Sequence, residues 1–121
     1  MSRRTKIDAN GDVVIVRLLE KEILDPRDDR NQTTEIGQDV FKQFDEKGKS
    51  LMLIDLSTVK CMNSAMLGNL MTANKKAKAK KGKVVIFGVD SDIMEVFIIT
   101  RLDKMLGIAE NEESAMQEVC S

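Results

Sequence analysis

The sequence predicts a small α/β sandwich, in which a mixed sheet of four or five strands packs against about four helices. Three observations support this prediction. A run rich in β-branched residues follows an Asn-Gly turn signal near the N-terminus, as in a β-hairpin. Residues 51–56 and 83–89 form nearly continuous apolar runs, which are typical of strands covered on both faces. Segments with helical periodicity separate these strands, and such crossovers make neighbouring strands parallel.

The N-terminal part is predicted to form the β-hairpin over residues 3–9 and 12–18. Asn10-Gly11 favours a type I′ turn between its two strands. A polar loop follows, in which Pro26 biases the residue before it away from a helix.

The first helix is predicted from about Gln32 to Lys47. Thr33 and Asn31 are candidate N-caps, and Gly48 can end the helix. Its apolar residues recur at helical spacing on one face: Ile36, Val40, Phe41 and Phe44.

The second helix is predicted after the strand at 51–56, from Ser64 to about Lys80, with Gly82 closing it. The lysines near its end complement the negative end of the helix dipole.

The rest of the chain continues the alternation after the strand at 83–89. Residues 90–92 can cap a third helix. A turn at Gly107 and a short edge strand precede a last helix, which residues 111–113 open and which ends at about Val119.

The composition excludes several classes of function. The chain has no histidine, which rules out a Ser-His-Asp triad, a His-ligated zinc site and histidine acid–base catalysis. Neither a GxxxxGK[ST] nor a GxGxxG motif occurs, so we expect no enzymatic activity, no metal-binding residue and no cofactor. The 19 basic and 20 acidic residues give a net charge of −1, which argues against direct nucleic-acid binding.

Targeting signals are also missing from the sequence. No apolar run approaches the roughly 20 residues that cross a bilayer, and no apolar segment of a secretory signal follows the N-terminus. Cys61 and Cys120 lie far apart and form no CxxC motif. We therefore expect one cytoplasmic domain over residues 1–121, with reduced cysteines.

The candidate site is the stretch Val59–Gly68, which leads into the second helix. Asn63-Ser64 would lie at a strand-to-helix corner, where the first helical N–H groups have no intrahelical partners and the Ser64 side chain is exposed. A phosphate could be held there, or Ser64 could simply cap the helix. A nucleophilic serine is disfavoured, because both glycines of the G-x-S-x-G elbow are missing.

At this corner the chain resembles a known family. Residues 53–68 read LIDLSTVKCMNSAMLG, which is similar to the signature of STAS domains, the fold of the anti-sigma factor antagonists. The order of elements agrees over nearly the whole chain, so the resemblance implies a STAS-like sandwich. The sequence departs from the pattern at Met66, where the family usually has glycine, and Asn63 replaces the commoner aspartate.

The resemblance implies that Ser64 is a phosphoacceptor, modified by a protein-serine kinase that can also act as the anti-sigma factor. Such partner switching would control the release of a sigma factor and thereby transcription. Asp25 resembles the family's acidic residue beside the acceptor serine and would orient its hydroxyl, unless it is a solvated loop acid. Asn63, Ala65 and Met66 would support the acceptor site or contact the partner.

Several alternatives stay open from the sequence alone. Ser64 could be an unmodified N-cap, and Met66 could be either a core residue or an exposed partner contact. Asp55 is expected to be a hydrogen-bonded structural acid near a strand end. The domain could instead be a non-phosphorylated STAS module, acting as a scaffold in a signalling complex or as a soluble subunit of a membrane lipid transporter. A homodimer is neither required nor excluded by the sequence.

Overall fold

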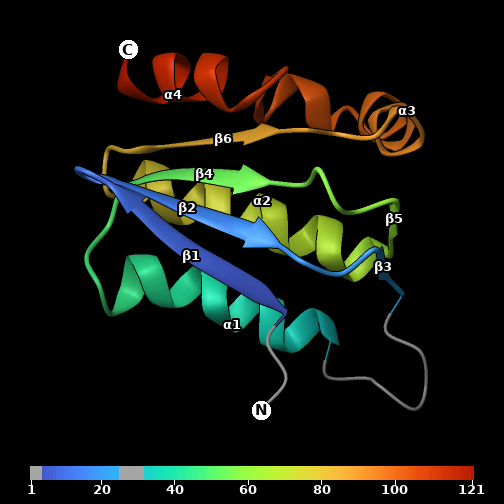
Figure 1. Ribbon diagram of the computed structural model, residues 1–121, viewed down its shortest axis with the longest axis horizontal. Helices are drawn as coiled ribbons and strands as arrows, with labels where there is room; N and C mark the ends of the chain where they lie inside the picture. Colours follow the sequence, from blue (N-terminus) through green and yellow to red (C-terminus); the bar gives the residue numbers. More distant parts are fainter. Residues whose placement is uncertain (1–3, 25–31) are drawn as a thin grey trace.

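The computed structural model describes residues 4–24 and 32–121 and contains a five-stranded mixed sheet (Figure 1). The strand order is β1-β2-β4-β6-β7, with β1 antiparallel to β2 and all other neighbours parallel. The strands of this sheet are β1 (Thr5–Asn10), β2 (Val13–Leu18), β4 (Leu51–Asp55), β6 (Lys83–Phe87) and β7 (Gly107–Ala109).

The remaining elements are four α-helices, one 3-10 helix and a separate pair of short parallel strands within the described residues. The helices are α1 (Gln32–Asp45), α2 (Ser64–Ala79), α3 (Ser91–Ile99), η2 (Leu102–Lys104) and α4 (Glu112–Cys120). The short strands are β3 (Glu22–Ile23) and β5 (Cys61–Met62), which pair in parallel register.

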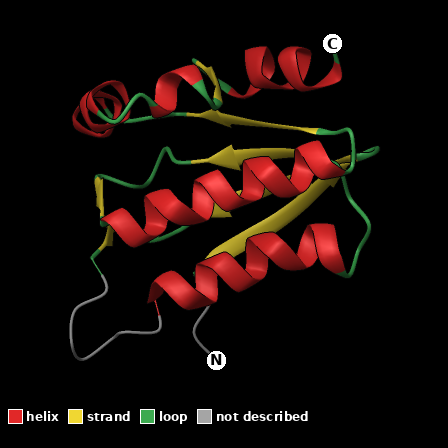
Figure 2. Ribbon diagram, turned by 180° about the vertical axis from the view of Figure 1, so that it is seen from behind, coloured by secondary structure: helices red, strands yellow, loops and turns green. Residues whose placement is uncertain are grey.

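Helices cover both faces of the sheet (Figures 1 and 2). Helices α1 and α2 lie side by side on one face, and α4 packs on the other, against β4 and β6. The alternation along β2 follows this arrangement: Val14 and Val16 pack in the layer of α1 and α2, whereas Val13 and Ile15 pack in the layer of α4. The strands β4 and β6 lie between the two layers, which confirms that their continuous apolar runs form central strands.

The N-terminal hairpin is confirmed, but its turn lies one residue later than predicted. Asn10 pairs with Val13, so the two loop residues are Gly11 and Asp12. Gly11 has a φ of +63°, and Asp12 is not among the residues with positive φ. This pattern fits a type II′ turn, in which only the first loop residue has positive φ, instead of the predicted type I′ turn.

The first helix begins at Gln32 as predicted and ends at Asp45, somewhat earlier than predicted. Thr33 lies within its first turn, so it is not the N-cap. The other candidate cap, Asn31, lies outside the described residues. Gly48, with a φ of +69°, follows the end of the helix in the left-handed conformation expected of a terminating glycine.

Gly82, predicted to end α2, has a different role in the structure. The left-handed residue after the helix is Lys81, with a φ of 61°, and not Gly82. Gly82 is required for another reason, because a Cβ atom there would lie 1.8 Å from the backbone oxygen of Ser50. The glycine thus permits the close approach of two backbones where β6 begins beside β4.

The C-terminal helices and strands are of the predicted types, but some of their first and last residues differ from the prediction. Asp90 caps α3 as predicted, and Asn111 caps α4, accepting a hydrogen bond from Ser114 N–H at 2.9 Å. The strand β6 ends at Phe87, before the predicted end. Gly107 lies in the edge strand β7 itself and not in a turn before it.

Candidate functional site

The corner at Ser64 is formed where predicted, but Asn63 is the N-cap of α2. The Asn63 Oδ1 atom accepts a hydrogen bond from the Met66 N–H at 2.8 Å, and Ser64 is the first helical residue. The alternative in which Ser64 itself caps the helix is therefore wrong. The Ser64 side chain is exposed, and its hydroxyl makes no hydrogen bond to any residue that the structure describes.

The start of α2 can accommodate negative charge. Within the described part of the chain, the backbone N–H groups of Ser64 and Ala65 have no hydrogen-bond acceptor. The first turn of α2 carries no acidic side chain. An anion at Ser64 would therefore meet unpaired N–H groups and the positive end of the helix dipole. A phosphoryl group on the Ser64 hydroxyl is electrostatically compatible with the folded chain.

Three hydrogen bonds hold the corner in place. The Asn63 N–H donates to the Ile23 carbonyl at 2.7 Å, which continues the pairing of β5 with β3. The Asn63 Nδ2 donates to the Thr33 Oγ1 at 3.3 Å. The Asn69 Nδ2 donates to the Thr33 carbonyl at 3.0 Å. The N-terminal parts of α1 and α2 and the short strand β3 are thereby fixed to one another.

Replacing the N-cap should weaken the corner measurably. We expect Asn63→Ala to lower the free energy of unfolding by about 1 kcal/mol, because the Met66 N–H loses its acceptor. Urea denaturation checks this value. Asn63→Asp is the matched control and should lose less stability than Asn63→Ala, since a carboxylate also accepts from the Met66 N–H, although it cannot donate to the Thr33 Oγ1. Equal losses for the two variants would contradict the capping role.

The other predicted site residues are divided between the core and the surface. Met66 is fully buried in the cluster beneath α1 and α2, so of the two alternatives left open by the sequence it is the core residue and not the exposed one. Its side chain instead packs inward from the first turn of α2. Ala65 is exposed beside Ser64. Asp25 lies outside the described residues.

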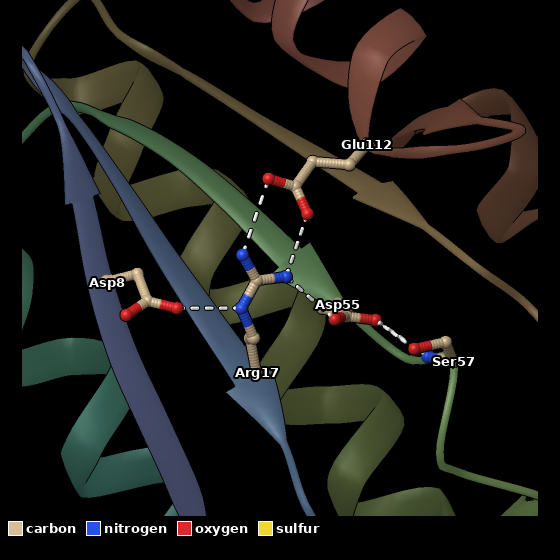
Figure 3. Close-up of polar contacts among 5 residues, drawn as sticks. All are labelled: Asp8, Arg17, Asp55, Ser57 and Glu112. Carbon is tan, nitrogen blue, oxygen red and sulfur yellow. Dashed lines mark hydrogen bonds and ion pairs between the residues drawn. The ribbon is translucent and has the colours of Figure 1, made fainter.

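A second polar feature is centred on Arg17, near the C-terminal ends of β2 and β4 (Figure 3). The Arg17 Nε donates to Asp8 at 2.8 Å, and its Nη1 donates to Asp55 at 3.0 Å and to Glu112 at 2.9 Å. Asp55 also accepts from the backbone N–H and the hydroxyl of Ser57, at 2.9 and 2.6 Å. Asp55 is thus a hydrogen-bonded structural acid, and the cluster joins β1, β2, β4 and α4.

The pKa values in this cluster follow from its contacts. Hydrogen bonding to Glu112 and then to Asp8 raises the pKa of the Arg17 guanidinium above its usual range. The hydrogen bond from Arg17 lowers the pKa of Asp8 below its ordinary value of 3.8. Both shifts favour the charged forms, so the cluster is an ion network that stabilises the fold.

The lowered pKa of Asp8 predicts a loss of stability in acid. Asp8 in the unfolded chain titrates near 3.9, and in the folded chain it titrates lower. Its stabilising effect is therefore present above about pH 4 and is lost as the pH falls through the folded-state pKa. Urea denaturation between about pH 6 and pH 2 should show a shallower acid-side decline for Asp8→Asn than for the native chain. An unchanged decline would contradict the Asp8–Arg17 pair.

The sequence reasoning missed this network except for Asp55. Arg17 interrupts the otherwise apolar strand VVIVRL, which is the one local signal that a charge is needed at that position. Its partners come from positions as far away as Glu112, a separation that no local pattern reveals.

Comparison with known proteins supports the predicted fold. The family model for the STAS domain matches residues 29–115. An anti-sigma-factor antagonist (STAS) domain protein from Planctomyces limnophilus has a TM-score of 0.83 at 16% identity, over 97% of this chain and 98% of that one. An anti-sigma factor antagonist from Mycobacterium paratuberculosis has a TM-score of 0.81 at 20% identity, over 97% and 93% of the two chains.

A third similar structure is that of SpoIIAA, a cell fate determinant of Bacillus, in its phosphorylated form. Its TM-score is 0.71 at 16% identity, over 95% of this chain and 98% of that one. At these identities the likeness shows the fold, and it confirms the STAS-like sandwich predicted from the sequence. No helix in the described ranges is long and apolar enough to span a bilayer.

Proposed function

Because this chain belongs to the STAS domain family, we propose that it is an anti-sigma factor antagonist that is switched by phosphorylation of Ser64. In its unmodified form it binds a protein-serine kinase that also acts as an anti-sigma factor. That binding releases a sigma factor from the kinase. Phosphorylation of Ser64 by the kinase ends the binding. The protein is then a regulatory binding module and not an enzyme.

The observation that carries the proposal is the position of Ser64. Its hydroxyl is exposed at the first position of α2, where a kinase can reach it. The N–H groups of Ser64 and Ala65, which have no acceptor among the described residues, tolerate a phosphoryl group, so modification changes the surface without requiring a change of fold. SpoIIAA supports the same view, because that protein has been determined in both unphosphorylated and phosphorylated forms with this fold.

The burial of Met66 also supports the proposal. A bulky side chain in place of the family's glycine would obstruct a partner if it projected from the first turn of α2. Met66 is instead fully buried, so the exposed surface at Ser64 and Ala65 is formed by small side chains.

The test is phosphorylation of the full chain by each purified protein-serine kinase encoded in the same genome. Intact-mass measurement after incubation with ATP should show one added mass of about 80 Da, that of a phosphoryl group. Ser64→Ala should abolish this species. If no kinase modifies the chain, or if Ser64→Ala is modified equally, the proposal fails.

Ser91 provides a matched control for this experiment. It is also exposed, occupies the first position of a helix and follows an N-cap, Asp90. Unlike Ser64 it is flanked by acidic residues, because Asp92 follows it in the first turn of α3. A second negative group is disfavoured there. We expect Ser91→Ala to be phosphorylated like the native chain.

A further inference from the structure

A small apolar pocket opens beside the Ser64 corner, between β5, α2 and α3. Its volume is about 120 Å³. Its apolar lining consists of Cys61, Met62, Leu67, Ile93 and Val96. We refer to it as the β5–α3 pocket. Figure 1 shows that β5 and α3 lie at one end of the sheet, near the C-terminal ends of β4 and β6.

The pocket and Ser64 belong to one surface. Two of its lining residues, Cys61 and Met62, directly precede the N-cap of α2. A third, Leu67, lies three residues after Ser64, and residues at this spacing are neighbours on the same side of a helix. A partner whose interface covers Ser64 can therefore extend to the pocket.

Helix α3 extends this apolar surface into solvent. Val96, at the pocket, is 40% exposed, and Ile99, one turn further along, is 79% exposed. The inner side of α3 is apolar too, because Ile93 and Phe97 are buried in the core. A short helix that is apolar on both sides is typical of one that has a partner on its outer side.

We infer that the β5–α3 pocket receives one apolar side chain of the kinase that binds around Ser64. This inference rests on the proposed function and names the contact that gives the complex its affinity. A cavity of about 150 Å³ accommodates benzene, so a pocket of 120 Å³ fits a single aliphatic side chain. A buried apolar anchor with a polar rim is the usual arrangement of a strong interface contact.

Charged groups supply that rim. The ammonium of Lys60, at the pocket, lies 3.5 Å from the Asp90 carboxylate, and Asp92 also lines the pocket. These charged groups can stay hydrated while the apolar side chain enters the pocket. A phosphoryl group on nearby Ser64 would add negative charge to the region that the partner must desolvate, which links the pocket to the switch.

The test compares two lysine substitutions on α3. Val96→Lys places an ammonium in the pocket, whereas Ile98→Lys changes a residue that does not line the pocket and is 57% exposed. The probe is the purified serine kinase that phosphorylates Ser64, with its dissociation constant measured by calorimetry without ATP. We expect Val96→Lys to weaken binding roughly tenfold or more, and Ile98→Lys about twofold at most.

The possible outcomes separate this inference from the proposed function. If the kinase phosphorylates Ser64 but binds Val96→Lys as tightly as the native chain, the pocket inference fails and the switch stands. If no kinase modifies Ser64, both fail. If sedimentation shows a dimer of the native chain that Val96→Lys dissociates, the occupant is a second copy and the inference is overturned. Val96→Ser, which adds no charge, should weaken kinase binding severalfold if the contact is apolar.

Discussion

Phosphorylation of Ser64 is expected to weaken binding of the partner kinase by about 100-fold, or ~3 kcal/mol. The modification adds roughly −1.5 to −2 charges at an exposed position where the unmodified chain has a neutral hydroxyl. The partner then has to desolvate this charge or is repelled by it. Calorimetric titration of the kinase with unmodified and phosphorylated chain, at one ionic strength and without ATP, measures the difference.

Two substitutions at the same position control for charge and for folding. We expect Ser64→Asp to weaken binding and to leave the free energy of unfolding equal or slightly higher, because an acid in the first turn favours the helix dipole. Ser64→Asn introduces a side chain of the same size as aspartate but without charge, and it should retain most of the affinity for the kinase. Equal binding by the phosphorylated and unmodified chains would contradict a switch at Ser64.

Met66→Gly is expected to destabilise the fold by about 4 kcal/mol, although glycine is the residue that the family usually has there. The Met66 side chain is fully buried, so its removal leaves a cavity in the layer of α1 and α2. Such a loss is a large fraction of the stability of a typical domain. Thermal unfolding should show a melting temperature lower by about 15 °C.

Ala65→Gly is the matched control, since it places glycine at the neighbouring exposed position. It should cost about 1 kcal/mol or less, which reflects only the lower helix propensity of glycine. If Met66→Gly cost no more than Ala65→Gly, the Met66 side chain would not contribute to the core.

The central strands and the helix starts could be predicted from the sequence because their signals are local. The apolar runs of β4 and β6 and the capping residues Asp90 and Asn111 each act within a few residues of chain. The short strands β3 and β5 could not be predicted. Two residues carry no periodicity, and their pairing joins segments far apart in the sequence.

The position of the site in the chain could be predicted from the sequence, but the roles of its individual residues could not. The Asn63-Ser64 pair locates the corner, yet which of the two is the cap depends on backbone geometry. The inward direction of Met66 depends on space that α1 and α2 leave in the core. The hairpin turn lies one residue later than predicted for a similar reason, because the register of the two strands decides which residues form the loop.

The antagonist function is tested most directly by displacement of a sigma factor from its complex with the kinase. Size-exclusion chromatography can follow the preformed complex after addition of excess unmodified chain, phosphorylated chain or Ser64→Ala. The unmodified chain and Ser64→Ala should release the sigma factor, and the phosphorylated chain should leave the complex intact. Retention of the sigma factor with unmodified chain, or equal release by the phosphorylated form, would contradict the proposed function.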